Sequence, residues 1–174
     1  MSTGTAMSSN LAAALIGELQ LEAAATRKCL ERIPAEKFDY KPHEKSMSMV
    51  RLATHVAEMT GWVIETVNKT ELDFATIDYK PFAPQTTEEL VGYLDKIVTD
   101  AVEALKNTSD EAMLENWTLR NGETVYFTMP RVQVLRGMVF NHIVHHRGQL
   151  SVYMRLNDIP VPALYGPSAD EGQM

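Results

Sequence analysis

Cysteine is almost absent from this sequence, since Cys29 is the only one among 174 residues. A single thiol cannot close an internal disulfide, which excludes a disulfide-stapled scaffold and suits a reducing cytoplasm. Lys and Arg form no run long enough to make a basic stripe, and the formal net charge is −7. Because binding to a phosphate backbone depends on clustered basic side chains, we expect no nucleic-acid partner.

Long apolar runs are also missing, because no uncharged stretch reaches the length of a transmembrane helix. The first ten residues lack the basic and apolar regions of a secretory signal peptide. Hydrophobic residues make up 45% of the chain and charged residues 22%, as in an ordinary globular domain. We therefore expect a soluble, acidic, cytoplasmic protein with no membrane partner. It would have a flexible tail over residues 1–10 and one domain over residues 11–174.

Helical periodicity is the main pattern that the sequence does contain. Apolar residues recur at helical spacing in four segments, and Pro34 ends the first of them. Thr86 and Glu89 have the form of a capping box at the start of the third helix. Four long helices predict an all-α fold, a four-helix bundle. The predicted helices cover residues 11–33, 48–68, 87–106 and 130–155.

The segments between these helices differ in character. Residues 70–85 contain two prolines and no clean period, so we expect a long connection there. Asn121-Gly122 separates two β-prone runs and predicts a small β-hairpin insert before the last helix, with both residues at positive φ. Thr128 and Pro130 then resemble an N-cap and a first-turn proline. The proline-rich C-terminal segment is expected to extend over the surface.

Two histidines lie in the middle of the apolar stripe of the last helix. Because residues i and i+4 are neighbours on a helix face, both imidazoles can point at the same object. The residues that share this stripe are Leu135, Met138, Val139, His142, His146, Gln149, Leu150 and Tyr153. A third histidine occupies the same kind of position on the second helix, in the stripe Leu52, His55, Val56, Met59, Val63 and Thr66.

Three histidines on two apolar helix faces predict a metal site formed by His55, His142 and His146. Imidazole ligands suit zinc, nickel, iron or copper and do not choose among them. Three protein ligands leave a coordination position open, which is typical of a catalytic rather than a closed structural site. His142 and His146 have the ligand spacing of the zinc-protease motif, but Ile143 stands where that motif has its glutamate. A peptidase mechanism is therefore not supported.

Five further residues are candidates for a role at this site, and each has an alternative interpretation. Glu22 is an acid–base group or a partner of a ligand, or else an edge residue that reaches solvent. His145 is a substitute ligand or a proton shuttle at the rim, or else it faces a neighbouring helix or subunit. Met59, Trp62 and Tyr153 shape a pocket around the metal, or else they simply pack in the core.

Two segments carry a resemblance to a known family. The run NHIVHHRGQLSVYMRLNDIPVPALYGPS resembles the C-terminal signature of the DinB-like family of metal-dependent bundle proteins. KPHEKSMSMVRLATHVAE resembles its second-helix signature. The resemblance implies an up-down-down-up four-helix bundle, usually dimeric, that binds nickel or zinc through three histidines. Those three positions correspond to His55, His142 and His146 here.

Related families imply a class of reaction for the chain. They include S-transferases that use bacillithiol or mycothiol, and a thiol-dependent maleylpyruvate isomerase. The resemblance therefore favours a metal-dependent enzyme acting on a small molecule, in which the ion serves as a Lewis acid or activates water or a low-molecular-weight thiol. A metal-dependent hydrolase and a non-catalytic metal-binding or assembly protein are the alternatives. Gly137 and Gly148 share one face of the last helix, and they predict a close helix contact within or between subunits.

Overall fold

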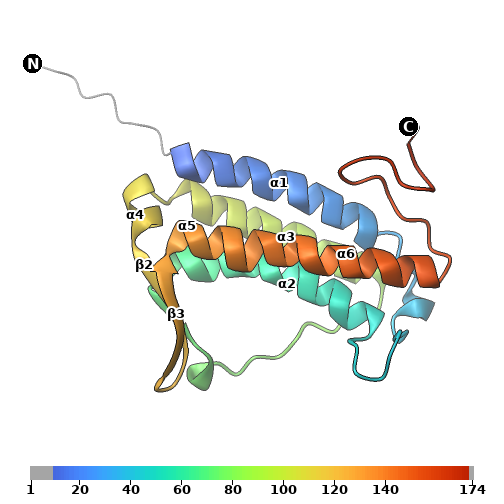
Figure 1. The fold of residues 1–174 in the computed structure, drawn as a ribbon, viewed down its shortest axis with the longest axis horizontal. Coiled ribbons are helices and arrows are strands. Elements are labelled where there is room, and N and C mark those ends of the chain that lie inside the picture. The colour runs from blue at the N-terminus through green and yellow to red at the C-terminus, as the bar shows by residue number, and fades with distance from the viewer. Residues whose placement is uncertain (1–9, 173–174) are drawn as a thin grey trace, which may run out of the picture.

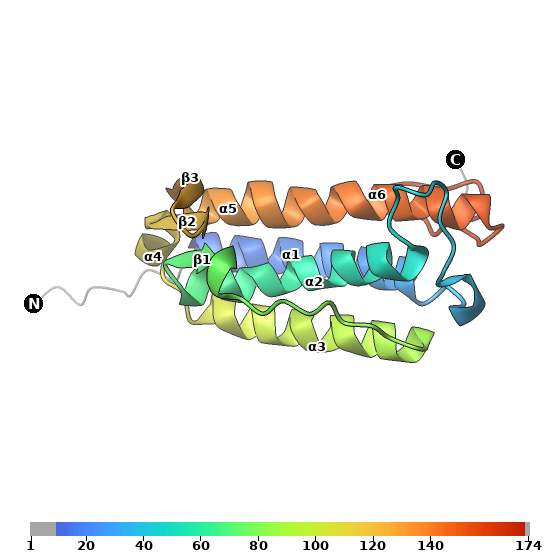
Figure 2. The same cartoon turned by 90° about the horizontal axis from the view of Figure 1, so that it is seen from below.

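Four long helices lie side by side in the computed structural model, which describes residues 10–172 (Figures 1 and 2). The predicted N-terminal tail lies outside the described residues, except that Asn10 is already the first residue of α1. The second and third predicted helices are confirmed within one residue at each end. The long helices are α1 (Asn10–Leu30), α2 (Met49–Asn68), α3 (Thr87–Lys106) and α6 (Asn141–Leu156).

Side-chain caps set the starts of α2 and α3, and the cap at Thr86 was predicted from the sequence. The Ser48 hydroxyl accepts a hydrogen bond from the backbone N–H of Arg51, and the Thr86 hydroxyl accepts one from Glu89. These bonds satisfy N–H groups that have no partner within the helix. The carboxylate of Glu89 reaches back to the N–H of Gln85, one residue before the position that a capping box predicts. Capping therefore fixes where both helices begin.

The predicted hairpin is present, but it belongs to a larger sheet. β2 (Asn116–Asn121) pairs antiparallel with β3 (Thr124–Pro130), and β1 (Glu71–Asp73) adds a parallel strand on the other side of β2. The prediction of an all-α fold with a hairpin insert is thus only partly correct, because residues 70–85 contribute a strand. A short 3₁₀ turn (Phe74–Thr76) follows that strand.

The hairpin turn lies one residue later than predicted. Asn121 pairs with Thr124, so Gly122 and Glu123 form the turn. Gly122 has a φ of 57°, whereas Asn121 does not have a positive φ. A single positive φ at the first turn position is the pattern of a type II′ turn, which requires glycine only there.

The last helix begins after β3 and contains a change of winding. Thr128 and Pro130 lie in the strand, so the predicted N-cap and first-turn proline are wrong. Helix α5 (Arg131–Val134) leads into a π-helical segment (Leu135–Phe140), which continues directly into α6. Buried Arg131 donates hydrogen bonds to three backbone carbonyls, those of Thr66 and Lys69 at the end of α2 and that of Ala112 in the short helix α4 (Asp110–Leu114).

The core lies along the inner face of α2 as predicted, but the core face of α6 is rotated. Leu52, Val56, Met59 and Val63 of α2 are buried. On α6 the buried residues are Ile143, Arg147, Leu150 and Met154, and the predicted histidine stripe lies at the edge of this face. The three histidines are consequently half-buried, between the core and the surface.

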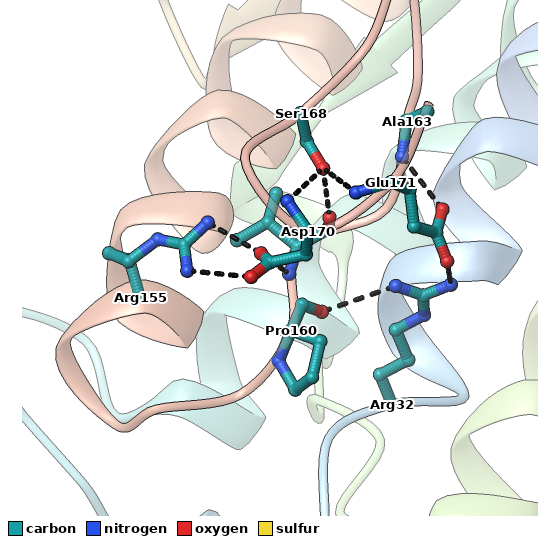
Figure 3. A network of polar contacts seen from close by, with 8 residues as sticks. Arg32, Arg155, Pro160, Ala163, Ser168, Asp170 and Glu171 are labelled. Atoms are coloured by element: carbon teal, nitrogen blue, oxygen red, sulfur yellow. Dashed lines mark hydrogen bonds and ion pairs between the residues drawn. The ribbon is translucent and has the colours of Figure 1, made fainter. Parts of the chain in front are cut away.

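The C-terminal segment folds back over the ends of α1 and α6 (Figure 3). Arg32, in the turn that follows α1, pairs with Glu171, and Arg155 of α6 pairs with Asp170. The Ser168 hydroxyl accepts hydrogen bonds from the N–H groups of Asp170 and Glu171, at 3.1 and 3.0 Å. The segment is therefore pinned to the bundle by specific polar contacts, rather than only extended over the surface.

Candidate metal centre

The structure brings together the three histidines that the sequence selects. His55 comes from α2, while His142 and His146 come from successive turns of α6. One ring nitrogen from each histidine lies within 4.8 Å of the others. The ring centroids are 4.6 to 5.1 Å apart. Packing of α2 against α6 thus converts residues distant in the sequence into one cluster of imidazoles.

The spacing of the ring nitrogens fits a divalent ion. The Nε2 atoms of His55 and His142 are 3.3 Å apart. Two nitrogens at about 2.0–2.1 Å from a tetrahedral zinc ion would be about 3.3–3.4 Å from each other. The candidate nitrogen of His146 lies within 4.8 Å of the other two. A donor set of three imidazoles is also one that zinc and nickel accept.

The charge state of the rings favours ligation. Burial, together with the neighbouring His146 and His142, lowers the pKa of His55 from 6.5 to about 4. Burial likewise lowers the pKa values of His142 and His146. Neutral imidazole is the form that binds a metal, because its free nitrogen carries a lone pair. At neutral pH all three rings are therefore ready to act as ligands.

Gln149 orients one of the rings, a role that the sequence did not suggest. Its side-chain oxygen lies 2.7 Å from Nδ1 of His146, and its amide nitrogen lies 3.1 Å from Nε2 of His145. The amide oxygen can only accept, so Nδ1 of His146 carries the proton and Nε2 keeps its lone pair. Hydrogen bonds of this kind fix the orientation of metal-binding histidines. The only sequence signal was the i, i+3 spacing of His146 and Gln149.

The two acid–base candidates, Glu22 and His145, differ from each other in their surroundings. Glu22 forms an ion pair with buried Arg147, and it accepts a hydrogen bond of 2.7 Å from the Tyr165 hydroxyl. Its carboxylate is thus engaged in linking α1, α6 and the C-terminal segment. His145 is exposed and contacts the cluster through ring packing against His146, with centroids 4.8 Å apart.

Two cavities meet the histidine cluster from different sides. A cavity of about 670 Å³ is lined by His55 and His142, together with the candidates Met59 and Trp62. A second cavity, of about 440 Å³, is lined by His146, Gln149 and Tyr153, together with residues of the loop before α2. Tyr153 is thus placed apart from Met59 and Trp62. The larger volume is in the range of small-molecule sites in proteins.

A carboxylate beside the larger cavity was missed in the sequence. Glu58 follows His55 by three residues on α2 and accepts hydrogen bonds from Arg51, from the Tyr79 hydroxyl and from the N–H of Phe82. Burial and the bond to Glu58 raise the pKa of Tyr79 to about 12. Phe82 stacks on Tyr93 of α3, with ring centroids 4.3 Å apart. These contacts hold the connection between β1 and α3 against the bundle.

Comparison with known proteins places the chain in a family. The model of the DinB family matches residues 6–173. The chain belongs to the DinB family. This DinB chain is 26% identical over 156 residues to the uncharacterized protein YrdA of Bacillus subtilis, covering 87% of this chain and 86% of that protein.

Crystal structures of two DinB-like proteins share the fold of this DinB chain. One, from Bacillus cereus ATCC 10987, is 24% identical, with a TM-score of 0.67 over 87% of this chain and 95% of that one. The other, YjoA of Bacillus subtilis, is 17% identical, with a TM-score of 0.69 over 86% and 96%. Across residues 10–172, no helix has both the length and the apolar character needed to cross a bilayer.

Proposed function

We propose that this DinB family protein is a metal-dependent enzyme that acts on a small molecule. The observation that carries the proposal is the convergence of three neutral imidazoles beside a cavity of about 670 Å³. A purely structural site would have little need of such a cavity. We propose His55, His142 and His146 as the ligands of a divalent ion, with nickel or zinc as the metal.

The reaction we favour is transfer involving a low-molecular-weight thiol. A divalent ion held by these three imidazoles would supply a Lewis acid, which would favour the ionised form of a thiol or a water molecule. The protein contributes the neutral ligands, the orientation of His146 by Gln149 and the cavity beside His55 and His142. His145, which is exposed and bonded to Gln149, is the residue we propose for exchange of a proton with solvent.

A cobalt-substituted sample distinguishes a thiol reaction from the alternatives. Adding bacillithiol or another small thiol should produce a sulfur-to-cobalt charge-transfer band in the visible spectrum. The same titration of His145→Ala should give the same band, because the ligand set is intact. No spectral change with any thiol would contradict the thiol reaction and favour either a water-activating hydrolase or a non-catalytic metal site.

We also propose a cytoplasmic homodimer whose helices follow the family's up-down-down-up order. The long connection that returns along the bundle between α2 and α3 supports this order (Figures 1 and 2). Gly137 and Gly148 are exposed, and a Cβ added at either would meet nothing within 4 Å. A close contact within the subunit is therefore wrong, and contact between two copies remains the proposal. Gly148→Leu should lower the mass measured by analytical ultracentrifugation; an unchanged mass would contradict it.

A further inference from the structure

The larger cavity beside the histidines has mainly apolar walls, and we call it the apolar cavity. It lies between α2, the paired strands β1 and β2, the connection after β1 and the π-helical segment. Its volume is about 670 Å³. The apolar side chains that line it are Met59, Trp62, Leu72, Phe74, Ile77, Leu119 and Met138.

The charged residues in the wall of the apolar cavity already pair with one another. Arg51 lies 2.9 Å from the carboxylate of Glu58, and Lys69 lies 2.5 Å from that of Glu65. Each positive charge is thus matched by a negative one from the same wall. A ligand with a charged body would have to compete with these pairs, and burying its charge without a partner would be costly.

Two aromatic or aliphatic side chains of the wall are left partly in solvent. Phe74 is 42% exposed and Ile77 is 40% exposed, although both face the cavity. Apolar surface that is exposed around a hollow gains free energy when a complementary apolar molecule covers it. The connection that carries Ile77 is held in place, since Tyr79 bonds to Glu58. The cavity is thus a preformed apolar surface rather than a collapsed one.

We propose that the apolar cavity binds the body of the substrate, and that this body is an uncharged alkyl or aryl group. Its polar head group would point to His55 and His142, the two imidazoles that reach the cavity. The identity of the head group rests on the proposed metal function, whereas the apolar body rests on the cavity alone. The substrate class is therefore a small hydrophobic molecule with one metal-binding group at its end.

A series of alkyl hydroxamates tests the class of substrate on the zinc-loaded protein. Affinity, measured by calorimetry, should rise by about fourfold for each methylene from acetohydroxamate to hexanohydroxamate. Ile77→Ala should weaken hexanohydroxamate by at least about threefold and leave acetohydroxamate unchanged. The matched control is Val152→Ala, which truncates a residue in the wall of the smaller cavity, 57% exposed, and should change neither value.

A second titration separates the cavity from the metal. In metal-free protein, 1-butanol, 1-hexanol and 1-octanol should change the tryptophan fluorescence at progressively lower concentrations, because Trp62 lines the cavity. Trp62→Phe should remove this signal, although Trp117 remains. Equal affinity for every hydroxamate, from acetohydroxamate to hexanohydroxamate, would overturn the proposed role of the apolar cavity and leave the metal centre standing. A protein that takes up no metal but responds to the alkanols would overturn the metal centre and leave the apolar cavity standing. If Val152→Ala weakens hexanohydroxamate and Ile77→Ala does not, the substrate body binds in the smaller cavity, which contradicts the proposal.

Discussion

The three imidazoles of the candidate centre are held in different ways. His146 is bonded to Gln149 at 2.7 Å, and His142 has a backbone hydrogen bond with Met138. His55 instead faces His142, with 3.3 Å between their Nε2 atoms. Two of the rings thus have a fixed proton on the side away from the cluster, so their other nitrogens are directed towards its centre.

Loss of the Gln149 side chain should weaken metal binding without removing a ligand. Gln149→Ala deletes the acceptor for His146, so we expect about a 10- to 100-fold loss of zinc affinity. The affinity is measured by competition with a chromophoric chelator. Gln149→Glu keeps an acceptor oxygen at this position and should retain most of the affinity. Equal affinity of the alanine variant and the unaltered protein would show that Gln149 does not orient the ligand.

The zinc affinity of this site should begin to fall at a lower pH than that of a site whose histidines have ordinary pKa values. Protons compete only with an imidazole that can be protonated, and burial lowers the pKa of all three rings, that of His55 to about 4. We expect chelator-corrected zinc affinity to be constant down to about pH 6.5 and to fall only below it. A fall that begins between pH 8 and 7 would contradict neutral, buried ligands.

The same shifts determine how the metal-free protein responds to acid. Between the ordinary histidine pKa of 6.5 and the folded value of about 4 for His55, the unfolded chain binds more protons than the folded one. The free energy of unfolding should therefore decrease as the pH falls through this window. Urea denaturation of metal-free protein at several pH values measures the effect, which zinc should oppose.

Single residues were predictable from the sequence only where local spacing determines their direction. The i, i+4 relation placed His142 and His146 together, and the apolar stripe of α2 placed His55 opposite them. Arg147 follows His146 directly, yet it is 1% exposed and belongs to the core face of α6. Its burial depends on Glu22 of α1, a partner that no local pattern reveals.

Helix α6 combines a functional edge with a structural core face. The edge carries the histidines, while the core face carries Arg147, whose guanidinium bonds to the carboxylate and carbonyl of Glu22 and to the Thr26 hydroxyl. The π-helical segment lies just before this part of the helix and includes Met138, which lines the apolar cavity. Such segments occur often at functional sites, where they change the direction of side chains along a helix.

Removing the buried end of the Glu22 ion pair should destabilise the bundle. Arg147→Met leaves the Glu22 carboxylate, which is 13% exposed, without its positively charged partner, so we expect the free energy of unfolding to fall by about 3 kcal/mol. Urea denaturation followed by circular dichroism measures the change. The matched control on the same helix is Arg155→Met, whose ion pair with Asp170 is half-exposed and should contribute about 0.5 kcal/mol. Equal losses of unfolding free energy in the two variants would contradict a larger contribution from the buried ion pair.

Helices could be predicted where the apolar periodicity and the capping residues agree. Strands that pair with distant parts of the chain could not. The bounds of α3 follow from its apolar stripe and from Thr86, and they match the structure. β1 has only three residues, and its parallel pairing with β2 joins segments far apart in the chain. The π-helical segment also has no clear sequence signal, because apolar residues fit both windings over so short a stretch.

Across the whole molecule, the fold places the imidazoles between the packed core and two cavities. The histidines lie at the edge of the core face of α6 and are therefore half-buried, which lowers their pKa values while keeping them accessible. The chain belongs to the DinB family and shares the fold of a DinB-like protein from Bacillus cereus. We propose that the three imidazoles together hold a divalent ion.

The most direct test is the metal content of the full chain produced without an affinity tag, measured by plasma mass spectrometry. We predict a single divalent ion per chain, nickel or zinc, in the unaltered protein and in His145→Ala. His55→Ala, His142→Ala and His146→Ala should each lose most of the metal while keeping their helical circular dichroism. A protein that arrives without metal and takes up neither zinc nor nickel would contradict the account. So would loss of the metal in His145→Ala but not in His146→Ala.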